Sequence, residues 1–261
     1  MKLLETKNLT FSYNKKCNIL EDINLSCHEN QIVTLLGLNG SGKTTLLKLL
    51  AGLINKYDGE ILVDNLSIKK ISIKNRATKI SYVSQLQSYL EDFIVKDFVL
   101  FSKLNKLKFI QNPTKNDEEE IFNYAKKLQI DYLLNKKLAE LSGGEKQIIS
   151  IFCALIQDTK IILMDEPTSA LDIKNQYKIL SLIKGLARQN NKLFIISTHN
   201  PNHALYLNSY VYILKDHKIY REGNAKEIIN KDILEKVYDN NICYSNELEY
   251  NEISFQDTKN N

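Results

Sequence analysis

The hydrophobic residues of this 261-residue chain alternate with polar residues in some segments and form continuous runs in others. Alternation over residues 1–36 predicts short strands with a hairpin turn at 14–16, and residues 59–68 predict a strand pair that turns at Asp64 and Asn65. Apolar runs predict strands at 32–36, 161–164 and 192–197, and the run at 161–164 is typical of a fully buried strand. A further hairpin is expected over 211–222, around Asp216 and His217.

Residues 86–150 carry no clear strand signals and instead favour helices. One helix is expected over 97–104. Another is expected after Asn116 as its cap, with acids in its first turn and Lys126 and Lys127 near its end. Further helices are expected over 174–189 and after Pro201. The last ~30 residues, rich in Asn and Glu, are expected to be weakly structured toward their end. The pattern predicts an α/β fold.

A glycine-rich loop follows the run at 32–36. Residues 37–44 have the phosphate-binding pattern G-x-x-x-x-G-K-T between a strand and a helix. Glycines at 37, 40 and 42 let the backbone N–H groups turn toward an anion at a helix N-terminus. Lys43 is expected to reach the β- and γ-phosphates, the Thr44 hydroxyl to bind Mg²⁺, and Thr45 to open the helix.

Two acids follow the run at 161–164. Asp165 and Glu166 are placed at the carboxyl edge of a buried strand, where open α/β sheets bind ligands. Asp165 is predicted to hold Mg²⁺, directly or through water. Glu166 is predicted to point the other way along the strand and to be the general base for an attacking water.

A histidine follows the run at 192–197. His199 is also expected at a strand's carboxyl end, where it could donate to the γ-phosphate. A metal shared with His203 is rejected because Pro201 disfavours one continuous helical turn between them. His203 is instead expected to be a helix-surface or contact residue.

Seven motifs resemble those of the ATPase subunit of ABC transporters, and they follow one another in the same order as in that family, over about residues 3–229. Residues 37–45 resemble the Walker A loop, 141–145 the signature motif, 169–172 the D-loop, and Asp165 with Glu166 the Walker B pair. Gln85 resembles the Q-loop glutamine, His199 the switch histidine and Tyr13 the aromatic residue that stacks on adenine. The nucleotide-binding residues implied by this resemblance are Tyr13, Gly37, Asn39, Gly40, Ser41, Gly42, Lys43, Thr44, Thr45, Ser142, Gly143 and Gly144. The implied Mg²⁺ ligands are Thr44, Gln85 and Asp165, and the implied catalytic residues are Glu166, His199 and Gln85.

The resemblance also implies an architecture. We expect a P-loop NTPase core with a mostly parallel sheet, a small antiparallel β subdomain and an inserted α-helical subdomain. The ATPase domain would span 1–230, with the core and β parts at 1–85 and 160–230 and the helical subdomain at about 86–158. Residues 231–261 would be a partly disordered extension. In the family, the Ser142-Gly143-Gly144 helix start faces the γ-phosphate of ATP on a second copy, which implies a head-to-tail dimer.

Composition limits the remaining functions. No apolar stretch approaches the ~18–20 residues that a bilayer crossing demands, and the N-terminus has no signal-peptide core. The four cysteines are scattered and are expected to be free thiols. A net charge of +4 does not indicate nucleic-acid binding. We therefore expect a peripheral subunit on the cytoplasmic face of the inner (plasma) membrane, partnered by polytopic permease subunits.

Two segments point to a narrower branch. Residues 92–99 and 198–205 resemble the ATPases that drive uptake of iron chelates, haem or cobalamin, which implies an extracytoplasmic substrate-binding protein as a partner. Ser84 and the pair Ser102-Lys103 depart from that branch's pattern. Three alternatives stay open: the ATPase of an exporter, a soluble ABC-type ATPase acting on nucleic acid, and a nucleotide-binding scaffold without turnover. An intact Asp165–Glu166 pair argues against the scaffold.

Overall fold

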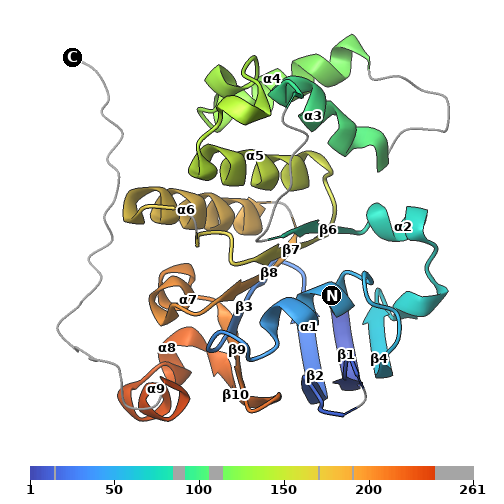
Figure 1. Ribbon diagram of the computed structural model, residues 1–261, viewed down its shortest axis with the longest axis vertical. Helices are drawn as coiled ribbons and strands as arrows, with labels where there is room; N and C mark the ends of the chain where they lie inside the picture. Colours follow the sequence, from blue (N-terminus) through green and yellow to red (C-terminus); the bar gives the residue numbers. More distant parts are fainter. Residues whose placement is uncertain (15, 85–91, 106–113, 170, 190, 239–261) are drawn as a thin grey trace.

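A computed structural model describes residues 1–14, 16–84, 92–105, 114–169, 171–189 and 191–238, and Figure 1 shows its two sheets and surrounding helices. The larger sheet has the strand order β10-β9-β3-β8-β7-β6, and the smaller has the order β2-β1-β4-β5. Strands of the larger sheet are β3 (Ile32–Leu36), β6 (Ile80–Val83), β7 (Ile161–Asp165), β8 (Leu193–Thr198), β9 (Tyr210–Lys215) and β10 (Lys218–Asn224). All neighbours in it pair in parallel except β9 and β10.

The core sheet is buried on both faces. Successive residues of a strand point to opposite faces, and each face packs into its own apolar cluster. Ile161 and Leu163 of β7 pack into one cluster with helix α1 (Lys43–Leu50) and the smaller sheet. Ile162 and Met164 pack into the other cluster with helices α5 (Gly143–Ile156) and α6 (Ile173–Gln189). Figure 1 shows α5 and α6 on one side of β7 and β8, and α1 on the other. The sequence-predicted burial of this strand is confirmed.

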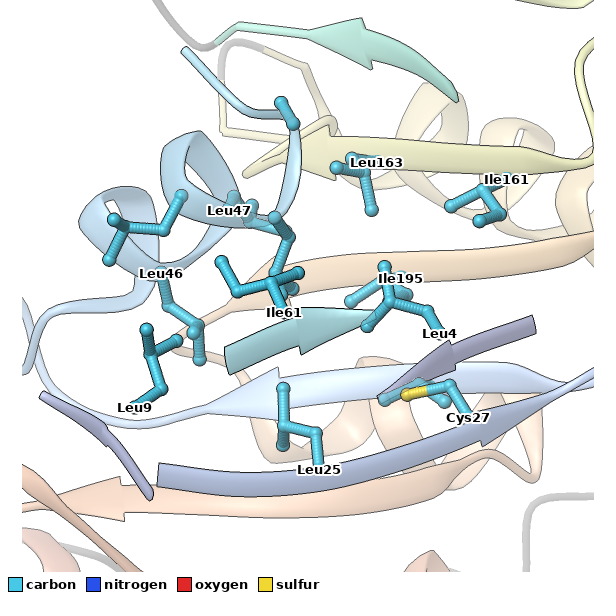
Figure 2. Packing of buried hydrophobic residues seen from close by; sticks show 14 of the residues in the cluster. Leu4, Leu9, Leu25, Cys27, Leu46, Leu47, Ile61, Ile161, Leu163 and Ile195 are labelled. Atoms are coloured by element: carbon cyan, nitrogen blue, oxygen red, sulfur yellow. The ribbon is translucent and has the colours of Figure 1, made fainter. Parts of the chain in front are cut away.

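The smaller sheet covers α1. It consists of β1 (Lys2–Phe11), β2 (Leu20–His28), β4 (Asp58–Val63) and β5 (Leu66–Ser67), all paired antiparallel. Figure 2 shows Leu9 and Leu25 of this sheet on the side of the helix residues Leu46 and Leu47, and Leu4 near Ile195 of β8, all in one apolar cluster. The phosphate-loop helix is therefore held between two sheets.

Two predicted hairpin turns are confirmed. Asp64 and Asn65, between β4 and β5, have φ values of 50° and 62°. Asp216 and His217, between β9 and β10, have φ values of 48° and 69°. Positive φ at both central residues is the conformation that two-residue hairpins favour, and Asn, Asp and His tolerate it better than most residues.

A group of helices forms its own small core. This core joins α3 (Val95–Phe101), α4 (Lys115–Lys127) and one face of α5. Figure 1 places these helices together, on the far side of the core sheet from β1, β2 and β4. The predicted cap of α4 was wrong: Thr114 caps the helix, not Asn116. The Thr114 hydroxyl accepts from the Asp117 N–H while the Asp117 carboxylate accepts from the Thr114 N–H, and this reciprocal pair leaves Asn116 inside the first turn.

The remaining α-helices of the described residues contact strands of the core sheet. They are α2 (Ile73–Ala77), α7 (Pro201–Leu207), α8 (Ala225–Ile228) and α9 (Lys231–Tyr238). Leu234 and Val237 of α9 pack with Leu36 and Ile213 of the core sheet. The chain beyond residue 230 thus begins with a packed helix. Within the described ranges, no helix is long and apolar enough to cross a membrane.

Candidate functional site

The segments that the sequence singled out leave neighbouring parallel strands at one edge of the core sheet. Strands β3, β8, β7 and β6 lie side by side in this order. The register pairs Leu36 with Thr198, and Ser197 with Asp165, so these strands end at nearly the same level. The phosphate loop, His199 and the two acids therefore meet at the carboxyl edge of the sheet. Gln85, which follows β6, lies outside the described residues.

The phosphate loop has the backbone that its glycines permit. Gly42 caps α1 with φ 97°, and a Cβ there would come within 3.0 Å of the Ile19 carbonyl oxygen. Gly37 lies so close to the next strand that a Cβ would meet the Leu214 carbonyl oxygen at 2.5 Å. Lys43 follows Gly42 as the first residue of α1 and is 5% exposed. The loop therefore cannot take larger residues at these two places without moving.

The Lys43 ammonium lies inside the loop. Its Nζ donates to the carbonyl oxygens of Gly37 and Leu38, at 2.8 Å each, and lies 3.9 Å from Glu166 Oε1. Burial lowers the pKa of Lys43, while the nearby carboxylates of Glu166 and Asp165 act in the opposite direction. The ammonium is thus positioned in a poorly solvated place where an anion would compensate its charge.

One polar atom of the loop fits a phosphate. Ser41 Oγ is buried and has no hydrogen-bond partner among the described residues. A buried hydroxyl without a partner costs about 1–3 kcal/mol. A phosphate oxygen in the loop would satisfy it, beside the N–H groups at the start of α1. Asn39 and Gly40 are exposed at the loop tip.

Asp165 is the acceptor of three side-chain hydroxyls. Thr44 Oγ1 donates to Oδ1 at 3.0 Å, and Ser197 Oγ donates to the same oxygen at 2.7 Å. Tyr82 Oη lies 3.5 Å from Oδ2, and burial raises the pKa of Tyr82, so its hydroxyl keeps its proton. A hydroxyl and a carboxylate side by side are oxygen ligands of the kind that Mg²⁺ takes. Sequence reasoning identified neither Ser197 nor Tyr82 as part of this site, because their contacts depend on strand register.

The sequence predicted that Glu166 points the other way from Asp165 along the strand, and this was wrong: its carboxylate lies on the same side, near Lys43. The strand ends at Asp165, and Glu166 has φ 45°, in the left-handed region. Its N–H donates to Ser197 Oγ at 2.9 Å. The change of backbone direction interrupts the strand alternation and brings the carboxylate to the Lys43 side, so both acids face the phosphate loop.

His199 contacts this second acid. Its Nδ1 lies 3.3 Å from Glu166 Oε1, and its side chain is 52% exposed. The carbonyl oxygen of His199 accepts a hydrogen bond from Tyr238 Oη at 2.7 Å. The end of α9 is therefore attached to the backbone of the histidine that contacts Glu166.

His203 differs from its sequence prediction. It is 5% exposed, so it is not a helix-surface residue, although it is a contact residue as the alternative had it. Both ring nitrogens have polar neighbours, among them Thr198 and Gln176. Its burial depends on α6, which packs over α7 from a distant part of the sequence.

Tyr13 lies beside the first turn of α1. Its side chain is 63% exposed, its ring meets Phe11 edge-on at 4.7 Å between centroids, and its hydroxyl lies 3.3 Å from Thr45 Oγ1. An exposed ring next to the phosphate loop is available for stacking on a planar base.

The Ser142-Gly143-Gly144 helix start belongs to the other face of the sheet. Ser142 caps α5, with its N–H and hydroxyl both donating to Glu145 Oε2 at 2.8 Å. These bonds, and Lys136 at 3.3 Å, hold the pKa of Glu145 below its ordinary value. α5 packs on the helical core and on α6, whereas α1 packs on the opposite face. One chain therefore does not bring Ser142 together with Lys43.

The chain is similar in sequence to known proteins. The family model for ABC transporters matches residues 20–169. A Haemophilus influenzae protein named an uncharacterized ABC transporter ATP-binding protein is 39% identical over 90% of this chain and 89% of its own length. A Helicobacter pylori protein named "probable iron chelatin transport ATP-binding protein" is 34% identical over 91% of this chain and 93% of its own.

Solved structures of ABC transporter proteins have a similar fold. An ABC transporter in an inward-facing conformation, described as of a metal-chelate type, matches with a TM-score of 0.79 and 29% identity over 92% of this chain and 90% of its own. A dimeric ATP-binding cassette with ADP and phosphate bound matches with a TM-score of 0.75 and 28% identity over 85% of this chain and 99% of its own. With the family model and these relatives covering most of the chain, the protein belongs to the ABC transporter family, as an ATP-binding subunit that hydrolyses ATP.

Proposed function

We propose that this chain powers the import of a metal chelate, such as an iron–siderophore complex, haem or cobalamin, through a membrane permease. ATP hydrolysis by this chain is supported by the close approach of Lys43, Glu166 and His199 at the carboxyl edge of the core sheet. The observation that favours chelate import is the likeness to a Helicobacter pylori protein named for iron chelatin transport and to a transporter of metal-chelate type.

The phosphate loop binds the triphosphate of ATP. The N–H groups of residues 39–45 and the Ser41 hydroxyl bond phosphate oxygens, and the Lys43 ammonium turns from the loop carbonyls to the β- and γ-phosphates. Tyr13 stacks on the adenine. Such contacts position the γ-phosphoryl group without taking part in bond making.

Glu166 accepts a proton from the attacking water. The water oxygen forms a bond to the γ-phosphorus, the bond from that phosphorus to the β–γ bridging oxygen breaks, and ADP leaves with that oxygen. His199, in contact with the same carboxylate, donates to the γ-phosphate and orients the water. Lys43 balances charge on the phosphoryl oxygens.

Thr44 and Asp165 are the residues of the described chain that would hold Mg²⁺. The hydroxyl and carboxylate are already 3.0 Å apart. Gln85 would be a further ligand by resemblance. Mg²⁺ commonly combines one or two protein oxygens with phosphate oxygens, and when bound it neutralises charge on the β- and γ-phosphates.

A second copy completes each site. ABC cassettes form dimers and work with permease subunits, and a related cassette is dimeric with ADP and phosphate bound. In a head-to-tail pair, the helix start at Ser142, Gly143 and Gly144 would face the phosphate loop of the other copy. Closure would move the helical subdomain, about residues 86–158, against the permease on the cytoplasmic face of the plasma membrane. Residues 1–230 would form the ATPase domain and 231–261 an extension, and an extracytoplasmic binding protein would supply the chelate.

The hydrolytic mechanism is tested with Glu166→Gln. Removing the proton acceptor should lower steady-state hydrolysis by at least about 100-fold, the scale of general-base catalysis, while Mg·ATP still binds and holds two copies together. Phosphate release and size-exclusion chromatography with ATP measure the two effects. Glu60→Gln, an exposed acid on β4, is the matched control. Hydrolysis near the wild-type rate in Glu166→Gln would remove this residue as the base.

Import is tested by uptake. Cells lacking this gene are complemented with the wild-type chain or with Glu166→Gln, and uptake of radiolabelled iron as a siderophore, of haem and of cobalamin is measured. We expect the wild-type chain alone to restore uptake of one of these. Export of a toxic compound restored by the wild-type chain, with no chelate uptake, would favour the exporter alternative.

A further inference from the structure

A buried imidazole lies directly behind the catalytic edge of the sheet. His203, in the first turn of α7, is 5% exposed. Its Nδ1 lies 3.1 Å from Thr198 Oγ1 and 3.4 Å from Thr168 Oγ1. Its Nε2 lies 3.2 Å from Gln176 Oε1 and 3.3 Å from Asn200 Nδ2. One side chain thus has polar neighbours on three separate segments of the chain.

These neighbours adjoin the two residues that contact each other in the site. Thr168 follows Glu166 by two residues, and Thr198 and Asn200 stand on either side of His199. The Asn200 N–H also donates to Thr198 Oγ1 at 3.0 Å, which tightens the turn after β8. The imidazole therefore bridges the segment that carries the proposed base and the segment that carries the histidine beside it.

The hydrogen-bond partners select one tautomer of the ring. Thr198 Oγ1 accepts from the Asn200 N–H, which leaves its hydroxyl hydrogen to donate to Nδ1 of His203, and the buried Thr168 hydroxyl faces the same nitrogen. The Gln176 amide is oriented by a bond from its Nε2 to the Leu171 carbonyl oxygen at 3.0 Å, so its Oε1 faces the ring as an acceptor. Nε2 has two neighbours of opposite kind, because Asn200 Oδ1 accepts from the Asn202 N–H and so leaves Asn200 Nδ2, a donor, facing the ring. The contact with Gln176 Oε1 is the shorter one and requires Nε2–H as donor, so Nδ1 accepts and Asn200 Nδ2 is a neighbour of the ring without a hydrogen bond to it.

The ring is also kept without charge. Burial lowers the pKa of His203 to about 4, and the nearby His199 acts in the same direction. Charged groups facing the ring would change this, and the neighbours within hydrogen-bond distance are hydroxyls and amides. His203 is therefore suited to a fixed connection between loops, not to proton transfer with the nucleotide.

We propose that His203 is a positioning residue for ATP hydrolysis: as the Nε2–H tautomer it joins the loop after β7 to the loop after β8, and so fixes the contact of His199 with Glu166. This inference rests on the proposed roles of those two residues in hydrolysis. Gln176, a residue of α6, contributes to this positioning because its Oε1 accepts the hydrogen bond from Nε2–H of His203. A small displacement of a reacting group can lower a rate by about 100-fold, so such a connection has kinetic consequences.

The variants are His203→Gln, His203→Ala and Gln176→Ala, with His28→Gln, an exposed position on β2, as the matched control. We expect His203→Ala to lower kcat by about 10- to 100-fold with KM changed by less than about 2-fold. His203→Gln should recover part of kcat, because an amide can both donate and accept. Gln176→Ala should lower kcat and add little in the His203→Gln background. His28→Gln should behave as the wild-type chain.

Two readouts separate positioning from folding. In the Glu166→Gln background, each His203 variant should still dimerise with Mg·ATP, which shows a folded nucleotide site. In ¹⁵N-labelled protein, the imidazole spectrum of the wild-type chain should show His203 as Nε2–H, and the His199 resonances should move in Gln176→Ala but not in His28→Gln.

Several results would overturn the inference. They are an Nδ1–H tautomer, an unchanged kcat in His203→Gln and Gln176→Ala, or a kcat loss that simply follows loss of ATP-dependent dimerisation. Failure of the proposed function is distinguishable, because it would appear as retained hydrolysis in Glu166→Gln itself. If Glu166→Gln is inactive while both His203 variants keep full kcat, the positioning role alone is wrong.

Discussion

Acid should destabilise this protein through His203 at a higher pH than through its carboxylates. Burial lowers the pKa of His203 to about 4 in the folded chain, from the ordinary value of 6.5 that applies to an unfolded one. Between these values the unfolded chain binds more protons, so stability present above pH 6.5 is lost as pH falls toward 4. The pKa difference corresponds to a loss of about 2 kcal/mol at pH 5 and about 3 kcal/mol at pH 4.

Urea unfolding measures this loss. The chain has no tryptophan and fourteen tyrosines, so far-ultraviolet circular dichroism and tyrosine fluorescence are the signals. The free energy of unfolding is compared between the wild-type chain, His203→Gln and His28→Gln from pH 7 to pH 4. We expect His203→Gln to lack the loss and His28→Gln to retain it.

Carboxylates act at lower pH. Hydrogen bonds from Lys103 and Thr114 hold the pKa of Asp117 well below its ordinary value, so its contribution is lost mainly below about pH 4. The two effects are therefore separable along the pH axis. If wild-type and His203→Gln proteins lose stability in parallel between pH 6.5 and 4.5, the buried neutral histidine is refuted.

Three further predictions concern the core, the phosphate loop and α9. Leu163→Ala removes a fully buried side chain between β7 and α1 and should lower the free energy of unfolding by about 2–5 kcal/mol in a urea titration. Gly42→Ala puts a Cβ at φ 97°, which costs about 1–2 kcal/mol, and within 3.0 Å of a carbonyl oxygen. Binding of a fluorescent ATP analogue should weaken accordingly. Tyr238→Phe deletes the hydrogen bond to the His199 carbonyl and should cost about 1 kcal/mol of stability and lower kcat, and an unchanged rate would show that α9 does not influence the site.

Features governed by neighbours in sequence could be predicted from the sequence. The turns at Asp64-Asn65 and Asp216-His217 are local, since their conformation depends on which residues tolerate positive φ. The buried strands β3, β7 and β8 follow from continuous apolar runs. The same reasoning fails where two nearby residues could each cap a helix. Asn116 is a good cap, yet Thr114 has an acid three residues later and forms the reciprocal pair.

Contacts between distant segments could not be predicted in this way. The link from Tyr82 to Asp165 requires that β6 pair with β7 in one register, and the link from Ser197 requires the same of β8. The burial of His203 requires α6 to cover α7. In each case the residue has an ordinary local role, on a strand or in a helix turn, and only the packing assigns it to the site.

The position of the Glu166 carboxylate shows how far such packing decides the chemistry. Strand alternation alone would send it to the face opposite Asp165. A hydrogen bond from its N–H to Ser197 and another from the Ser169 N–H to its carbonyl oxygen accompany a left-handed backbone instead. Such a conformation costs about 1–3 kcal/mol for a residue other than glycine. The cost is met by bonds from the neighbouring strand and the following turn, so both acids reach the phosphate loop because β8 lies beside β7.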